Sequence, residues 1–159
     1  MTLLGHTTDD PYDGRDRVVR WIATAVGVVF LVVGVLGFVP GVTTDQDTLA
    51  FAGHHSEAEL LGIFQVSGLH NLLHIAFGLA GVVLGRRAGS AVAYLLAGGA
   101  AYLGLWVYGL VVDHDSAANV VPVNSADNYL HLALGLGMIA LGLLGQRIWR
   151  GTVANRTAQ

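Results

Sequence analysis

Three histidines and an aspartate stand at spacings that suit metal binding inside an otherwise apolar sequence. His70 and His74 are four residues apart, so a helix would place them on the same face. A second apolar segment supplies His131 and Asp127. Three imidazoles and a carboxylate form a ligand set that suits a divalent transition metal such as zinc, copper or iron. One interpretation of the sequence is therefore a metal site made by His70, His74, His131 and Asp127.

Haem is a second candidate cofactor for the same region. His74 and His131 could serve as its two axial ligands if they lie on neighbouring helices. The sequence around them contains no Arg or Lys to meet the haem propionates, so we expect haem less than a metal ion.

A structural polar core is the third interpretation. Polar side chains within membrane helices often hold the helices together through hydrogen bonds. We expect this core to contain Gln65, Asn71 and Asn128. In this interpretation Asn71 would pair with Asn128, and His70 would pair with Asp127.

The two segments that carry these residues resemble each other. Residues 70–85 (HNLLHIAFGLAGVVLG) and 127–142 (DNYLHLALGLGMIALG) align without a gap, and eight of the sixteen positions are identical. The shared asparagine and the shared histidine are the informative matches, because polar residues are rare inside apolar segments. The chain is therefore predicted to contain an internal repeat.

The composition places these segments in a membrane. The 159 residues are 53% hydrophobic and 12% charged, and 22 of them are glycine. Four stretches are long enough to cross a hydrocarbon core of about 30 Å as helices. They lie at about residues 21–39, 60–84, 90–112 and 128–144, in a membrane domain at 20–147 between polar tails at 1–19 and 148–159. The predicted fold is all-α, a bundle of four transmembrane helices.

The positions of the arginines predict the orientation. All eight basic residues are arginines, and they lie before the first span, between the second and third spans, and after the fourth. The other two loops contain acidic residues and no basic ones. By the positive-inside rule, both termini lie in the cytoplasm. We expect the membrane to be the cell membrane. This distribution gives no support to nucleic-acid binding.

This orientation gives the repeat a geometry. The second and fourth spans run in the same direction, which predicts two parallel helical hairpins related by a pseudo-two-fold axis. Asparagine, histidine and glycine share one face of each of these spans. Because small residues let helices approach closely in lipid, we expect the second and fourth spans to pack together. Ser125 is the expected N-cap of the fourth helix.

Three segments resemble the signature of a known family: GIFQVSGLHNLLHIAFGLAG, YLGLWVYGLV and NVVPVNSADNYLHLALGLGMIALG. The family consists of small bacterial four-helix integral membrane proteins catalogued as a domain of unknown function. The motifs HNxxH in the second span and ADNxLH in the fourth carry the resemblance, which covers about residues 17–147. The resemblance implies the membrane topology and assigns no activity and no site residue.

The sequence leaves three classes of function open. The first is a non-enzymatic membrane component whose polar core sets helix packing, since no nucleophile with its base and no cysteine is present. The second is a metal-binding membrane protein. The third is a small transporter or proton relay, which would need oligomerisation because four helices make a narrow pathway. The expected partners are the lipid bilayer and either a second copy of the chain or another membrane protein.

Overall fold

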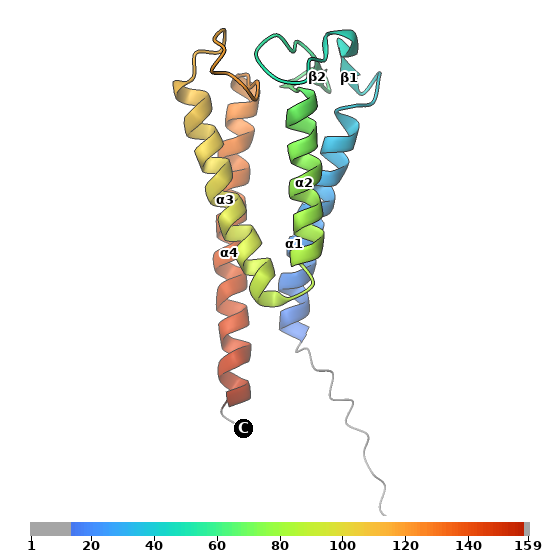
Figure 1. Ribbon diagram of the computed structural model, residues 1–159. Coiled ribbons are helices and arrows are strands. Elements are labelled where there is room, and N and C mark those ends of the chain that lie inside the picture. The colour runs from blue at the N-terminus through green and yellow to red at the C-terminus, as the bar shows by residue number, and fades with distance from the viewer. Residues whose placement is uncertain (1–13, 158–159) are drawn as a thin grey trace, which may run out of the picture.

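The computed structural model describes the backbone of residues 14–157 and the side chains of residues 14–151. Four helices run side by side, with short strands at one end (Figure 1). In chain order the elements are α1 (Gly14–Leu36), β1 (Thr43–Thr44), the 3₁₀-helix η1 (Gln46–Thr48), β2 (Glu59–Leu60), β3 (Phe64–Gln65), α2 (Gly68–Leu84), α3 (Ala88–Val111) and α4 (Ser125–Thr157). We call the two ends of the bundle the strand end and the terminal end. Most of the predicted N-terminal tail, residues 1–13, lies outside the described residues.

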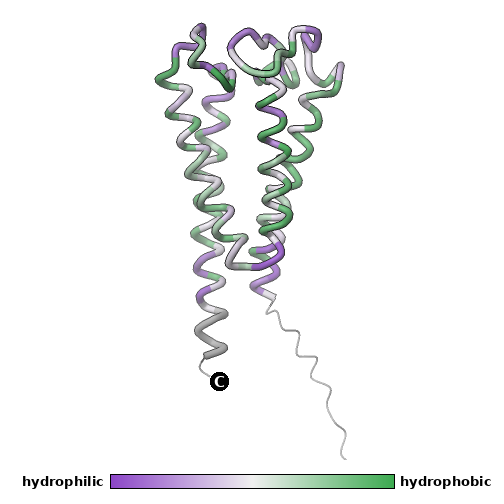
Figure 2. Tube along the Cα trace, viewed as in Figure 1, coloured by the Kyte–Doolittle hydropathy of each residue, from purple (hydrophilic) through white to green (hydrophobic). Residues whose placement is uncertain are grey.

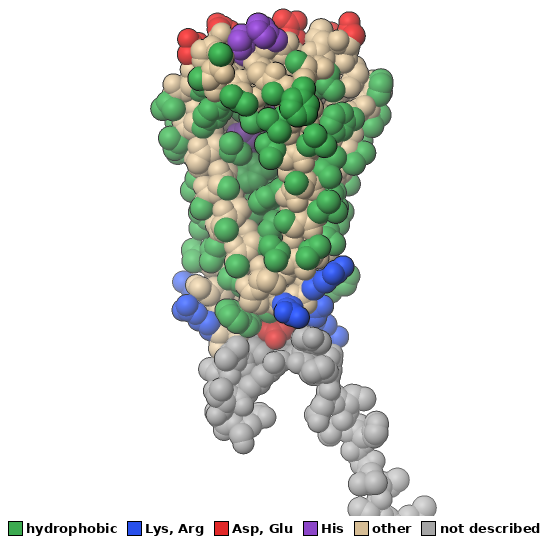
Figure 3. Space-filling model, in the orientation of Figure 1, with side chains coloured by type: hydrophobic (Ala, Val, Ile, Leu, Met, Phe, Trp, Pro, Cys, Tyr) green, Lys and Arg blue, Asp and Glu red, His purple; other side chains and the backbone are tan. Residues whose placement is uncertain are grey.

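Three of the helices are long and apolar enough to cross a membrane. They are α1, α3 and residues 125–151 of α4, and α2 is a further apolar helix of 17 residues. Apolar residues dominate the middle of each helix, and polar residues gather towards both ends of the bundle (Figure 2). Arginines lie at the terminal end, whereas acidic side chains gather at the strand end (Figure 3). The structure is thus mostly helical with membrane-span-like helices, as the composition predicts.

The prediction that the second span begins near residue 60 is wrong. Residues 60–67 are not helical, because β2 pairs antiparallel with both β1 and β3, and Leu60 lies opposite Phe64. In the turn between β2 and β3, Leu61 has a φ of 56° and Gly62 a φ of 66°. Successive residues in the left-handed region cannot continue a right-handed helix. The helix α2 therefore begins at Gly68.

The first and last helices, α1 and α4, are longer than the predicted spans. The helix α1 begins at Gly14 rather than near residue 21, and α4 continues to Thr157 through most of the predicted C-terminal tail. The sequence prediction used apolar length, which measures the thickness of the membrane. A polar helical turn beyond the membrane leaves no such signal.

The helices pack as two hairpins, α1 with α2 and α3 with α4. Gly27 of α1 lies directly on the backbone of α2, where an added Cβ would stand 2.7 Å from the Gly78 oxygen. Gly99 of α3 lies on α4 in the same way, 2.8 Å from the Gly135 oxygen. Gly78 of α2 and Gly135 of α4 thus face α1 and α3, the helices of their own hairpins. The expected close packing of the second and fourth spans through their glycines is wrong.

Three further pairs of equivalent contacts occur in the two hairpins. They pair Gly37 with Asn71 and Gly109 with Asn128, Leu31 with Gly78 and Leu103 with Gly135, and Thr24 with Gly85 and Leu96 with Gly142. The residues from α1, and Gly37 just after it, all lie the same number of positions before their counterparts from α3. A second constant offset relates the members from α2 and its end to those of α4. The two hairpins therefore use the same contacts in the same order.

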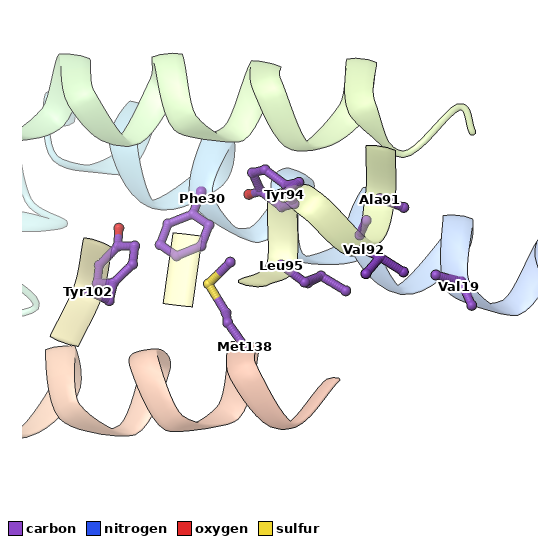
Figure 4. Packing of buried hydrophobic residues seen from close by; sticks show 9 residues of the cluster. Val19, Phe30, Ala91, Val92, Tyr94, Leu95, Tyr102 and Met138 are labelled. Carbon is purple, nitrogen blue, oxygen red and sulfur yellow. The ribbon is translucent and has the colours of Figure 1, made fainter. Parts of the chain in front are cut away.

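The hydrophobic core joins the two hairpins through α1, α3 and α4 (Figure 4). Its centre is aromatic. The ring of Phe30 stacks on Tyr102 with centroids 5.2 Å apart, and Phe77 meets Phe30 edge-on at 4.9 Å. This aromatic layer adjoins the histidines. The ring centroids of His74 and Phe30 are 5.6 Å apart, and those of His131 and Tyr102 are 5.5 Å apart. It forms the floor beneath the polar residues of the strand end.

Candidate functional site

The N-termini of α2 and α4 hold the site residues at equivalent helix positions. Ser67 is the N-cap of α2, and its Oγ accepts a hydrogen bond from the His70 N–H at 3.1 Å. Asn124 has the same place before α4, and its Oδ1 accepts from the Asp127 N–H at 3.0 Å. The offset between the two caps in the sequence equals the offset between His70 and Asp127. His70 and Asp127 are therefore both the third residue of their helices.

The cap of α4 differs from the predicted one. Ser125 is the first helical residue and is exposed, whereas Asn124 caps the helix. The Asp127 carboxylate accepts in return from the Asn124 N–H at 2.9 Å, which completes a capping box. The signal in the sequence is an asparagine placed three residues before an acidic residue.

Asp127 also connects the two hairpins. Its Oδ2 accepts from the Gln65 N–H of β3 at 3.0 Å, and the Asn124 Nδ2 donates to the Ile63 carbonyl at 2.8 Å. We call Ile63, Gln65, Asn124 and Asp127 the polar clamp, because they fasten the start of α4 to the strands that precede α2. Asp127 is only 2% exposed. The expected pairing of His70 with Asp127 does not form, since the carboxylate is held by the backbone N–H groups of the clamp.

The structure brings the three predicted histidines together between α2 and α4. The ring centroids of His70 and His74 are 4.7 Å apart, and those of His70 and His131 are 6.3 Å apart. We call these three residues the histidine group. The His74 Nδ1 donates to the carbonyl of His70 at 3.1 Å, because a carbonyl only accepts.

Two nitrogens of the histidine group have unmet hydrogen-bonding capacity. The Nδ1 atoms of His70 and His131 are buried and have no hydrogen-bond partner among the described residues. The side chains are 5% and 2% exposed, respectively. A buried polar group left without a partner costs about 1–3 kcal/mol. His70 and His131 are thus two residues of the polar core whose hydrogen-bonding capacity is not fully used within the described residues.

The two predicted asparagines lie in equivalent places but do not pair. Asn71 packs against Gly37, and Asn128 packs against Gly109. The Nδ2 of Asn71 and the Oδ1 of Asn128 have no hydrogen-bond partner in the described part of the chain. Each asparagine therefore meets a glycine of its own hairpin, and the expected amide pair across the axis does not form.

Metal binding by the predicted ligands remains a prediction. Within residues 14–151, no three His, Cys, Asp or Glu side chains are placed to hold one metal ion together. The Asp127 carboxylate accepts from the Gln65 and Asn124 N–H groups, and His74 uses its Nδ1 on a carbonyl. The Oδ2 of Asp127 and the Nδ1 of His74 are thus engaged in hydrogen bonds within the protein. Haem ligation also remains a prediction.

Two cavities flank the histidine group, and all three of its rings line both. The first, which we call the α2–α3 chamber, has a volume of about 180 Å³. Its walls are His70, Leu73, His74, Phe77, Ala101, Tyr102, Leu105, Val121 and His131. The second has a volume of about 120 Å³ and also contacts Asn71, Asp127 and the strands. A histidine side chain is visible in the recess between the two hairpins (Figure 3).

Tyr102 is a site residue that sequence reasoning misses. The tyrosines of such a chain are expected at the membrane interface, but Tyr102 is 5% exposed and lies between Phe30 and His131. The available signal is its register. The offset from Phe30 to Tyr102 in the sequence is the one that separates Gly27 from Gly99, so both hairpins supply an aromatic residue at the same level.

The comparison with curated proteins gives no match, and neither does the comparison with solved structures. The sequence profile of a family described as a domain of unknown function, DUF4383, matches residues 20–144. That range contains the polar clamp, the histidine group and both motifs on which the resemblance rests. The resemblance to a family of unknown function is thereby confirmed, and the chain belongs to the DUF4383 family.

Proposed function

We propose that this protein is a non-enzymatic, multi-pass component of the cell membrane in which all four helices cross the bilayer. The helix α2 has 17 residues and rises about 25 Å at about 1.5 Å per residue. This length is close to a hydrocarbon core of about 30 Å. Its contacts with α1 run from Gly85 at the terminal end to Asn71 at the strand end. The whole of α2 therefore lies at the depth of a helix that is long enough to span.

The distribution of charge supports cytoplasmic termini. Arg86 and Arg87 follow α2 at the terminal end, where Arg17 and Arg20 also lie in the first turns of α1. The acidic loops lie at the opposite end (Figure 3). The positive-inside rule places the arginine-rich end in the cytoplasm.

We also infer that the two hairpins are structural repeats related by a two-fold axis along the membrane normal. The support comes from the four pairs of matched contacts, which keep one constant offset between α1 and α3 and another between α2 and α4. The N-caps Ser67 and Asn124 follow the second of these offsets. An axis of this kind relates α1 to α3 and α2 to α4.

In this arrangement the polar clamp holds the strand ends of the two repeats together. The observation that carries this proposal is the Asp127 carboxylate, whose Oδ2 accepts from the Gln65 and Asn124 N–H groups at 3.0 and 2.9 Å. Without this acceptor, two partly buried N–H groups on different hairpins would lose their partner. The protein thus sets helix packing through its polar core. Association with a second copy or with another membrane protein remains a prediction.

The test compares two aspartates that differ in their contacts. Asp127→Ala should lower the free energy of unfolding by about 2–6 kcal/mol, because two N–H groups each lose an acceptor worth about 1–3 kcal/mol. Asp115 is exposed, and Asp115→Ala should change it by no more than about 0.5 kcal/mol. Unfolding of the purified proteins in mild detergent measures both.

A third variant keeps the test informative if Asp127→Ala does not fold. Asp127→Asn retains one carbonyl oxygen and loses the charge, so its stability should lie between those of the wild type and Asp127→Ala. Wild-type stability in Asp127→Ala would overturn the proposed role of the clamp.

A further inference from the structure

We propose that the α2–α3 chamber and the groove below it bind a membrane-soluble molecule with an uncharged carbonyl- or hydroxyl-bearing head and a single apolar tail. The head lies against the histidine group. The tail lies along α2 and α3 towards the terminal end.

The walls of the chamber select the chemistry of the head. His70 and His131 line the chamber and carry the buried ring nitrogens that have no partner among the described residues. A neutral imidazole has one donor and one acceptor, so it can donate to a carbonyl oxygen or accept from a hydroxyl. Residues 21–85 and 88–146 contain no Lys or Arg, and the strand end is acidic. The surroundings therefore favour an uncharged oxygen-bearing head over an anionic one.

The groove below the chamber suits an apolar tail. It has a volume of about 390 Å³ and lies between α2 and α3. Its lining consists of Phe77, Ala80, Leu84, Ser90, Ala93, Tyr94, Ala97 and Gly98. Phe77 also lines the chamber, so the chamber and the groove share a wall at this residue. Ala97 and Ala101 are exposed one turn apart on α3, which leaves the groove open to lipid.

The opposite face of the bundle provides a built-in comparison. There a groove of about 300 Å³ lies between α1 and α4, and Ala25 occupies the position that corresponds to Ala97. That groove and the second histidine cavity have no lining residue in common within the described chain. The groove that shares a lining residue with a histidine cavity is therefore the one on the α2–α3 face. No clamp residue lines the α2–α3 chamber, so this inference does not depend on the proposed role of the clamp.

The experiment measures thermal unfolding of the full chain in lipid nanodiscs with three probes that share a ten-carbon tail. They are a decyl-substituted benzoquinone with a carbonyl head, a ten-carbon monoacylglycerol with a hydroxyl head, and decylbenzene with no polar head. A ligand present at about 100 times its Kd should raise the Tm by roughly 5–10 °C. We expect a saturable rise with at least one of the two oxygen-bearing probes and none with decylbenzene. The probe that binds identifies the head chemistry.

Matched variants locate the site. Ala97→Phe should fill the groove and remove the rise, whereas Ala25→Phe, the equivalent change on the opposite face, should leave it unchanged. His131→Leu should remove the rise and His131→Asn, which keeps a polar group near Nδ1, should retain part of it. The proposal is overturned by an equal rise with decylbenzene, by no rise with either oxygen-bearing probe, by a rise that survives Ala97→Phe or His131→Leu, or by a rise that Ala25→Phe also removes.

Discussion

Replacing Gly99 by alanine should force α3 away from α4, while the same change at Gly104 of the same helix should not. A Cβ at position 99 would lie 2.8 Å from the Gly135 oxygen and 2.7 Å from the Ile139 Cγ1. The first of these atoms belongs to the backbone of the facing helix and cannot rotate aside. A Cβ at position 104 would meet no atom within 4 Å. Both variants therefore replace a glycine of α3 by alanine, and they differ only in whether the new Cβ contacts the facing helix.

The magnitude follows from two opposing effects. In a helix, alanine is favoured over glycine by about 1 kcal/mol, and both variants gain this amount. For Gly104→Ala the gain is the whole effect. Overpacking a close contact typically costs about 1–3 kcal/mol. The two variants should therefore differ by about 1–3 kcal/mol, or roughly 2–12 °C in Tm for a chain of this length.

Thermal unfolding in mild detergent, followed by circular dichroism, measures the difference. Gly27→Ala makes the equivalent change in the first hairpin, where the Cβ would lie 2.7 Å from the Gly78 oxygen, so its loss should be of similar size. Equal Tm values for Gly99→Ala and Gly104→Ala would refute the close contact of α3 with α4. A loss at Gly99 without one at Gly27 would refute the equivalence of the two hairpins.

Two further predictions concern topology and metal. The chain contains no cysteine, so a membrane-impermeant maleimide applied to intact cells should label Asp115→Cys and spare Gly14→Cys until the membrane is opened; the reverse pattern would overturn the orientation. If the polar core has the proposed structural role, elemental analysis should find equal transition-metal content in the wild type and in a His70→Ala, His74→Ala, His131→Ala triple variant. One equivalent of metal that only the wild type retains would establish the metal site instead.

The sequence predicts which segments are apolar better than it predicts where a helix begins. Leu60 to Phe64 form an apolar run shortly before α2, and hydropathy alone assigns them to the span. Their actual conformation depends on β1, because Thr43 pairs with Leu60 across the sheet. A contact between segments this far apart leaves no local signal. The turn at Gly62 then separates the strands from the helix.

The sequence predicts the site residues that the two matching segments share, but it does not predict which helices pack together. The matched motifs identify His74 and His131 as equivalent residues, and the structure places both beside His70. The glycines on α2 and α4 indicate close approach, but they do not say to which helix. Gly27 and Gly99 decide that question, and their role becomes visible only when α1 is aligned with α3 at their constant offset in the sequence.

The position at which the starts of α2 and α4 differ accounts for the two proposed roles of the polar core, the clamp and the binding site. His70 and Asp127 are each the third residue of their helix, and each donates its N–H to the N-cap residue. At the start of α4, the Gln65 and Asn124 N–H groups both need an acceptor, and a carboxylate supplies it. At the start of α2, the Ser67 cap accepts the His70 N–H in the same way, but the Nδ1 of the His70 side chain has no hydrogen-bond partner among the described residues. A histidine there keeps a ring nitrogen free beside the chamber, and the proposed division between clamp and binding site follows from this single asymmetry.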